Sequence, residues 1–325
     1  MADISVTLFD GIDADPEFGG EELLTGPSGA RQGWMWIDVA GTLDEQTRSV
    51  LHDRLAIPAL AIQDAGRTRH PPKLELLDEY SFLLLREITP GATSRNPEIN
   101  PLSLFMNTRA VITVHTARSA VIDDVKGIIA EKGRAAAKDP AALAYIICRR
   151  LADLCEPVIL SQEENLARIE DDIFDGADDS AVEALSRLNR ILRRLRRVLA
   201  YQSKVFELLQ NRVREKVVPL DKHEANDLFE NMDRLATLCQ LNQELAVDLL
   251  NTHLSVVSHR LNIIMRILTV ATIVFLPLGL LAGIYGMNFE VMPELSWEYG
   301  YFAVLGTMAT IAVGLTLFFK VKDWL

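Results

Sequence analysis

The stretch ILTVATIVFLPLGLLAGIYGMNF, residues Ile267–Phe289, contains no charged side chain. A second charge-free run, YFAVLGTMATIAVGLTLFF, follows at Tyr301–Phe319. Each run is close to the 20 residues that a helix needs to cross a bilayer. The alternative is that both runs are core helices of a soluble protein, but helices made of these residues would have no polar face to expose to water. We therefore predict transmembrane helices at about 267–287 and at 301–319, joined by an outer loop at 288–300.

The charges around the two runs predict their orientation. Basic residues precede the first run and follow the second, namely Arg260, Arg266, Lys320 and Lys322. The loop carries acidic residues instead, namely Glu290, Glu294 and Glu298. Because basic residues remain on the cytoplasmic side, both chain ends, including the tail 320–325, are expected in the cytoplasm. The loop would then form an acidic outer mouth.

One long helix leads into the first run. Leucines recur from about Asp221 onward, and no proline or glycine interrupts the chain before Pro277. At about 1.5 Å per residue, the segment up to Met287 would extend on the order of 100 Å, which is too long for one globular core. We predict a stalk helix over 221–289 whose far end enters the membrane.

Residues 1–118 have the alternating pattern of a small α/β domain. Strands are expected near 33–39 and 82–85, and at 102–106 and 110–115 around a turn at Asn107. A helix is expected over Thr42–Leu55, with Thr42 as its N-cap and Glu45 as the capping-box partner. The first domain should therefore be α+β and precede the long helices.

Residues 119–220 change to a helical pattern. Ala141–Phe174 and Ser180–Arg212 predict an antiparallel helical hairpin, with Pro157 bending or dividing the first helix. The second helix carries the basic run Arg190–Arg197, which no aromatic platform accompanies. We interpret this run as a solvated face paired with acids of the first helix, namely Glu163, Glu164, Glu170 and Asp171.

Composition narrows the class of function. A net charge of -12 over 325 residues opposes a nucleic-acid partner and favours cations. The three cysteines and six histidines lack the spacing of a metal site, so we expect reduced cysteines and no cofactor. No phosphate loop, His-Glu-x-x-His motif or nucleophile elbow is present, so we expect no catalytic residue and no enzyme. The first residues lack the basic start and apolar run of a signal peptide.

The tripeptide Gly286-Met287-Asn288 ends the first apolar run. Asn288 offers a neutral amide oxygen, and Gly286 permits a tight loop. Elsewhere such a tripeptide would be an ordinary helix cap, but here it lies between two membrane spans. Two spans cannot enclose a water-filled path, so transport would require a ring of subunits. A ring of amide oxygens suits a hydrated divalent cation, because magnesium holds its water tightly.

The sequence YGMNFE at residues 285–290, followed by Met292-Pro293-Glu294-Leu295 and Trp297, resembles the signature and outer loop of the CorA-type magnesium channels. Further matching stretches are Pro277, Ala282-Gly283-Ile284, Trp324-Leu325, His70-Pro71-Pro72-Lys73 and Glu79-Tyr80. The resemblance extends over essentially the whole chain. It implies a funnel-shaped homopentamer, usually in a bacterial inner membrane, that passes magnesium, and also cobalt or nickel, passively through the bilayer.

The resemblance also implies particular site residues. The filter would be Gly286, Met287 and Asn288. The pore face of the stalk helix would include Asn262, Met265, Leu268, Thr272, Leu276, Gly279 and Gly283, which recur every three or four residues. Regulatory magnesium between neighbouring cytoplasmic domains would fall on Asp227, Glu230 and Glu98. The chain departs from the family at Gly279, where relatives often have threonine, and at Asn251, where they have an acid.

Two other functions remain open at this stage. Zinc transporters of the same superfamily share the fold and a Gly-x-Asn motif, although this chain lacks a histidine or cysteine cluster for a softer ion. A non-conducting membrane scaffold or sensor would use the same long helices for assembly only.

Overall fold

The computed structural model describes residues 2–10, 15–24, 33–91, 96–174, 179–212, 220–287, 292, 297–322 and 324. The chain divides into two compact units, Met1–Asp248 and Leu249–Leu325. The boundary between the units falls inside one long helix, α6 (Lys222–Tyr285).

The first unit contains the sheet and most of the helices. Its strands are β1 (Asp3–Phe9), β2 (Glu17–Gly19), β3 (Trp34–Ala40), β4 (Lys73–Leu76), β5 (Ser81–Thr89), β6 (Glu98–Met106) and β7 (Ala110–His115). The helices are α1 (Glu45–Ser49), the π-helical η2 (Val50–Arg54), α2 (Ala59–Ala65), α3 (Ala120–Lys132), α4 (Pro140–Phe174), α5 (Asp179–Asn211) and the start of α6 (Lys222–Tyr285). Short 3-10 turns lie at η1 (Glu21–Leu23) and η3 (Gly133–Ala135).

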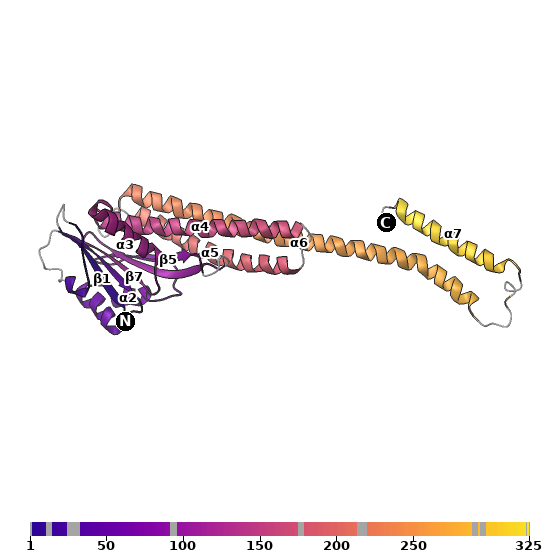
Figure 1. Ribbon diagram of the computed structural model, residues 1–325, viewed down its shortest axis with the longest axis horizontal. Helices are drawn as coiled ribbons and strands as arrows, with labels where there is room; N and C mark the ends of the chain where they lie inside the picture. Colours follow the sequence, from indigo (N-terminus) through magenta and orange to yellow (C-terminus); the bar gives the residue numbers. More distant parts are fainter. Residues whose placement is uncertain are drawn as a thin grey trace. The chain divides into compact units, whose positions relative to one another are not determined.

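The seven strands form one mixed sheet in the order β2-β1-β3-β7-β6-β5-β4. Only the pairing of β3 with β7 is parallel among these described strands. Phe82 and Leu84 of β5 belong to a core that includes Ile62 of α2, and the alternate residues Leu83 and Leu85 face the side where α4 packs (Figure 1). Helices cover both faces, which explains why β5 is buried along nearly its whole length.

The hairpin expected around Asn107 is confirmed. β6 and β7 pair antiparallel, with Met106 opposite Val111. The Asn107 side-chain oxygen accepts from the backbone N–H groups of Arg109 and Ala110, each at 2.8 Å. A short polar side chain that bonds its own backbone is what specifies such a turn.

The predicted start of the first helix is wrong. α1 begins at Glu45 and is capped by Asp44, whose Oδ1 accepts from the Thr47 backbone at 2.9 Å and from its hydroxyl at 2.7 Å. Thr42 lies outside the helix, because the Asp44 carboxylate satisfies two donors where a threonine hydroxyl would satisfy one. Pro157 lies inside α4, which continues through it as a single helix.

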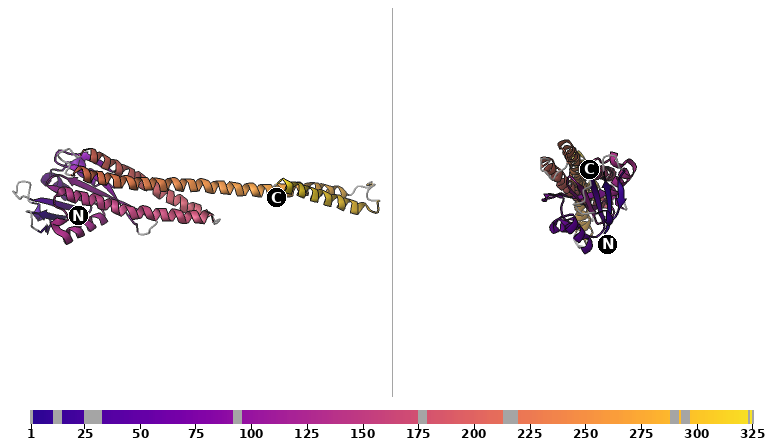
Figure 2. Two further views of the ribbon diagram at one scale, coloured as in Figure 1. Left: turned by 90° about the horizontal axis from the view of Figure 1, so that it is seen from above. Right: turned by 90° about the vertical axis from the view of Figure 1, so that its left-hand side faces the viewer.

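Three helices of the first unit form a bundle. α4 and α5 pack as the expected hairpin, and the first part of α6 lies beside both (Figure 2). The buried leucines of α5 repeat every three or four residues, as at Leu185, Leu188, Leu192, Leu195 and Leu199. All three cysteines are free and buried, and burial raises the pKa of each thiol to about 12. They are therefore protonated, as expected of structural thiols.

The second unit holds the rest of α6 and helix α7 (Gly300–Val321). α7 lies alongside the last part of α6 (Figures 1 and 2). Both helices are long and apolar enough to cross a membrane. Among the described large apolar residues beyond Leu249, only Val270 and Phe319 are buried. An apolar surface of this extent needs lipid or further subunits to cover it.

A buried charge network joins β3 and β7 to α3. Asp38 is 2% exposed, and its carboxylate contacts Lys126 Nζ at 2.6 Å and His115 Nε2 at 3.2 Å. The Thr113 hydroxyl donates to the same carboxylate at 2.6 Å, and Trp36 Nε1 donates to that hydroxyl at 3.1 Å. Burial opposes ionisation of Asp38, but His115 and Lys126 outweigh it and lower its pKa.

The stability of this unit is expected to fall as the pH rises from about 6.5 through the raised pKa of His115, because folded His115 loses its proton over that range. Its Nδ1 faces the Ala117 carbonyl at 2.7 Å while Nε2 faces Asp38, so both ring nitrogens meet acceptors. Burial opposes protonation, but Asp38 outweighs it and raises the pKa of His115. A basic group whose pKa is higher in the folded than in the unfolded state stabilises the fold. This stabilisation is fully present below the unfolded-state pKa and is lost as the pH rises through the folded-state pKa.

Thermal unfolding from about pH 6 to about pH 9 checks this expectation. The unfolding temperature of the parent chain should decline over this range more steeply than that of a His115→Gln variant. Equal slopes in the two proteins would contradict the assignment.

Candidate functional site

The predicted pore residues lie on one face of α6. The seven positions from Asn262 to Gly283 fall within an arc of about 120°, taking 100° per residue for an α-helix. All seven are exposed in the single chain. Such a stripe suits either a packing seam between helices or the lining of a pore in an assembly.

The chemistry of this face changes along the helix. Asn262 is polar, and the side chains of Met265, Leu268 and Leu276 are 65%, 66% and 66% exposed. Beyond them, a Cβ on Gly279 would meet no atom within 4 Å, and the same holds at Gly283. The Thr272 hydroxyl donates to Leu268 O of its own helix at 2.9 Å. Toward any other group it can therefore act only as a hydrogen-bond acceptor. Along the helix, the face therefore runs from a polar residue through bulky apolar residues to two glycines.

The proposed filter begins where α6 ends. Gly286 N–H donates to Ala282 O at 2.9 Å, and Met287 N–H donates to Ile284 O at 3.3 Å. Gly286 does not adopt a positive φ. Its role is close approach, since a Cβ would lie 3.0 Å from the Ala282 carbonyl oxygen. Asn288, Glu290 and Glu294 lie outside the described residues, so the filter amide and the acidic mouth remain predictions.

The proposed regulatory acids already have partners within one chain. Asp227 accepts from the Tyr145 hydroxyl at 2.7 Å and lies 3.7 Å from Arg149 Nη1. Glu230 accepts from Asn226 at 2.7 Å. Burial and the bond to Asp227 raise the pKa of Tyr145, so this hydroxyl remains a donor.

Glu98 opens β6 and is exposed. Among the described residues of a single chain, no three or more His, Cys, Asp or Glu side chains gather into a group that could hold a metal. The regulatory role of Asp227, Glu230 and Glu98 therefore stays a prediction from the sequence.

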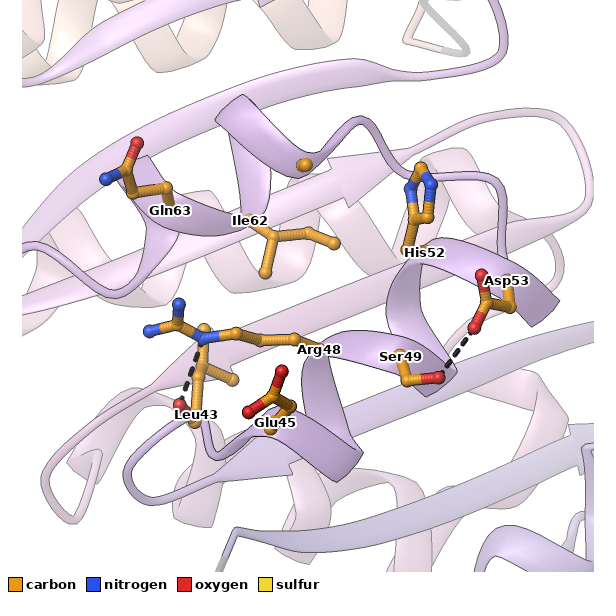
Figure 3. Close-up of a pocket in the computed structure, with 9 residues that line it drawn as sticks. Leu43, Glu45, Arg48, Ser49, His52, Asp53, Ile62 and Gln63 are labelled. Carbon is orange, nitrogen blue, oxygen red and sulfur yellow. Dashed lines mark hydrogen bonds between the residues drawn. The ribbon is translucent and has the colours of Figure 1, made fainter.

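A pocket of about 640 Å³ lies in the first unit, beside α1, η2 and α2 (Figure 3). Its polar groups are largely bonded to one another. Arg48 Nε donates to Leu43 O at 3.1 Å, and the Ser49 hydroxyl donates to Asp53 at 2.6 Å (Figure 3). His52 Nδ1 lies 2.9 Å from Ile57 O. Because these polar groups already have partners beside the irregular π-helical turn η2, we assign the pocket no part in ion transport.

The ion pairs expected for the basic run of α5 are wrong. Among the described residues, none of Glu163, Glu164, Glu170 and Asp171 forms an ion pair with an arginine of Arg190–Arg197. Arg196 instead donates to Gln243 of α6 at 2.5 Å. Helical periodicity places these acids and arginines on their own helices, but only the hairpin packing decides which faces meet.

Comparison with known proteins identifies the family. The family model described as CorA-like Mg2+ transporter protein matches residues 31–321, which is most of the chain. The chain belongs to this CorA-like family. Its members are integral membrane transporters rather than enzymes, and α6 and α7 provide the two C-terminal apolar helices. The predicted family and its transport class are thereby confirmed.

Individual relatives agree with this membership. The cobalt/magnesium transport protein CorA of Thermotoga maritima is 28% identical over 295 residues, covering 89% of this chain and 83% of that protein. The complete structure of the CorA magnesium transporter from Methanocaldococcus jannaschii superimposes with a TM-score of 0.81 at 19% identity, over 99% of this chain and 98% of that one.

The cytoplasmic domain of ZntB from Vibrio parahaemolyticus has a TM-score of 0.63 at 16% identity, covering 79% of this chain and 99% of that domain. The CorA-like fold is therefore confirmed, with an α+β domain, long helices and two apolar C-terminal helices.

Proposed function

We propose that this chain assembles into a homopentameric channel that passes hydrated magnesium passively across a bacterial inner membrane. The observation that carries the proposal is the match to the CorA-like family over residues 31–321, joined to an exposed face of α6 that leads to Gly286 and Met287. Both chain ends lie in the cytoplasm, as the flanking basic residues predict. Cobalt and nickel are the other ions we expect it to carry.

The mechanism follows from five copies of the α6 face around one axis. Asn262 contributes a polar ring at the cytoplasmic end. Met265, Leu268 and Leu276 form apolar rings that exclude water, and so ions, when the helices are close together. Gly279 and Gly283 leave room for a hydrated ion. Asn288 completes the path with a ring of amide oxygens that recognise the hydration shell without removing it.

The direction of flow follows the electrochemical gradient. A membrane potential that is negative inside favours inward movement by about 2.3 kcal/mol per charge for each 100 mV. The acidic residues Glu290 and Glu294 at the outer mouth would raise the local cation concentration before entry.

Uptake by proteoliposomes tests the proposal. Vesicles with the full chain should accumulate magnesium when an inside-negative potential is imposed, and protein-free vesicles should not. Cobalt, nickel and zinc are measured in parallel. Uptake of zinc in preference to magnesium would favour the alternative that the ZntB likeness supports, namely a zinc transporter. No uptake of any of the four ions would favour a non-conducting scaffold or sensor.

Replacing Asp227 with lysine is expected to shift magnesium-dependent closure to at least about tenfold higher internal magnesium, because ligand charge sets the affinity of such sites. Patch recordings across a magnesium titration measure the shift. Glu244→Lys is the matched control, since Glu244 is another exposed acid of α6.

A Tyr145→Phe variant separates ion binding from structure. It removes the hydrogen bond to Asp227 and keeps the carboxylate. If Tyr145→Phe and Asp227→Lys shifted closure equally, Asp227 would be a structural residue. An unchanged titration in Asp227→Lys would remove it from the regulatory site.

A further inference from the structure

A cavity of about 760 Å³ lies between α4 and α5 and takes no part in the ion pathway. The charged residues that line it are Arg168, Asp172, Arg187, Arg190 and Arg194. On each helix these positions recur at intervals of three and four residues, so each set occupies one helix face. The four arginines are exposed. Their guanidinium groups are therefore accessible to a ligand from solvent.

The charge balance of this cavity is opposite to that of the chain. Among the lining residues that the structure describes, four guanidinium groups accompany one carboxylate, in a protein whose net charge is -12. Arg187 and Arg190 are three residues apart, and Arg190 and Arg194 are four apart, so like charges are neighbours on α5. Such pairs destabilise a helix. An anion in the cavity would relieve this repulsion.

The hydrogen-bond donors of these arginines are largely unused. Arg168 donates to Asn165 Oδ1 at 2.6 Å and to Glu164 O at 3.3 Å, and Arg187 lies 3.4 Å from the exposed Glu183. Arg190 and Arg194 have no hydrogen bond or ion pair to any residue that the structure describes. Glu163, Glu164, Glu170 and Asp171, the partners expected from the sequence, form no ion pair with either arginine. The guanidinium N–H groups of Arg190 and Arg194 are therefore available to bind a ligand.

The lining favours a particular ligand chemistry. Guanidinium forks match phosphate oxygens in a bidentate geometry. The volume falls in the range of about 300–1,000 Å³ that small-molecule sites occupy. The described lining residues include Ile169 and Ile191 but no aromatic side chain, so they offer a nucleic-acid strand no stacking platform. We propose that this cavity binds a phosphate-bearing anion, held chiefly by Arg190 and Arg194.

Calorimetry on the full chain in phosphatidylcholine nanodiscs tests the proposal, with pyrophosphate and metal-free ATP as probes and adenosine as the phosphate-free control. The parent chain should bind pyrophosphate or ATP saturably and leave adenosine unbound. An Arg190→Gln/Arg194→Gln variant should bind at least about tenfold more weakly. The matched control is Arg193→Gln/Arg197→Gln, which removes the same charge at the same spacing on the same helix but outside the cavity. It should bind within about twofold of the parent.

A second arm distinguishes soluble phosphates from lipid headgroups. Phosphatidic acid is added to the nanodiscs, and the unfolding temperature is followed in the parent and in both double variants. A rise that requires Arg190 and Arg194 would make the lipid headgroup the source of phosphate, whereas binding of the soluble probes alone would make it a soluble ligand. Either result supports the site.

The proposal is overturned if neither source binds the parent chain, or if both double variants lose binding equally. Misfolding of the Arg190→Gln/Arg194→Gln variant is checked without ligand. It should unfold at the same temperature as the parent or higher, because a repulsive pair has been removed.

Discussion

Replacing Asn288 with alanine is expected to reduce magnesium uptake by at least about tenfold. Each subunit would lose one hydrogen-bond partner for the hydrated ion, worth about 1 kcal/mol net. Around a ring of five these losses add, and about 1.4 kcal/mol already corresponds to a factor of ten. In the sequence, Asn288 follows the end of α6 at Tyr285 by three residues.

Uptake by proteoliposomes at matched protein content measures the effect. Thr316→Ala is the control, because it also converts a polar residue of a membrane span to alanine. The Thr316 hydroxyl bonds Ala312 O of its own helix at 2.8 Å and lies on α7, away from the proposed pore face. Parent-like uptake in the Asn288→Ala variant would exclude the amide ring as the filter. The size of the purified assembly should be the same in all three proteins.

Replacing Asp38 with alanine is expected to lower the free energy of unfolding by about 3 kcal/mol, because it removes a buried carboxylate whose partners His115 and Thr113 are also buried. Lys126 loses its partner at 2.6 Å, and His115 loses the acceptor at 3.2 Å. The buried Thr113 hydroxyl also loses the carboxylate to which it donates. An Asp38→Asn variant keeps the shape and one acceptor, so it should fall between the parent and the alanine variant.

Urea unfolding in detergent micelles, followed by tryptophan emission, measures this loss. Trp36 reports directly, since it is buried and bonded through Thr113 to the network. Asp123→Ala is the matched control, because its pair with Arg118 has the same 2.6 Å separation but lies at the surface. The control should change stability little, since solvent screens exposed pairs. If Asp38→Ala and Asp123→Ala had equal effects, burial would not be what makes the Asp38 network stabilising.

The sequence alone determined the features that depend on neighbouring residues. Charge-free runs long enough to span a bilayer are visible without a structure, and so is the absence of proline and glycine from Asp221 to Leu276. The turn at Asn107 was predictable for the same reason, because its side chain bonds backbone groups two and three residues away. The periodic face from Asn262 to Gly283 follows from the geometry of one helix.

Only the tertiary structure decided the features that join distant segments. The parallel pairing of β3 with β7 brings Asp38 to His115 and Thr113, about seventy-five residues away in sequence. The hairpin of α4 and α5 places Arg190 and Arg194 on a cavity and leaves Glu163 and Glu170 without an ion pair to them. Helical periodicity states which residues share a face, but the contact between two faces depends on how the helices rotate as their cores pack. The periodic face of α6 could therefore be predicted from one helix, whereas the buried network and the arginine cavity required the packed fold.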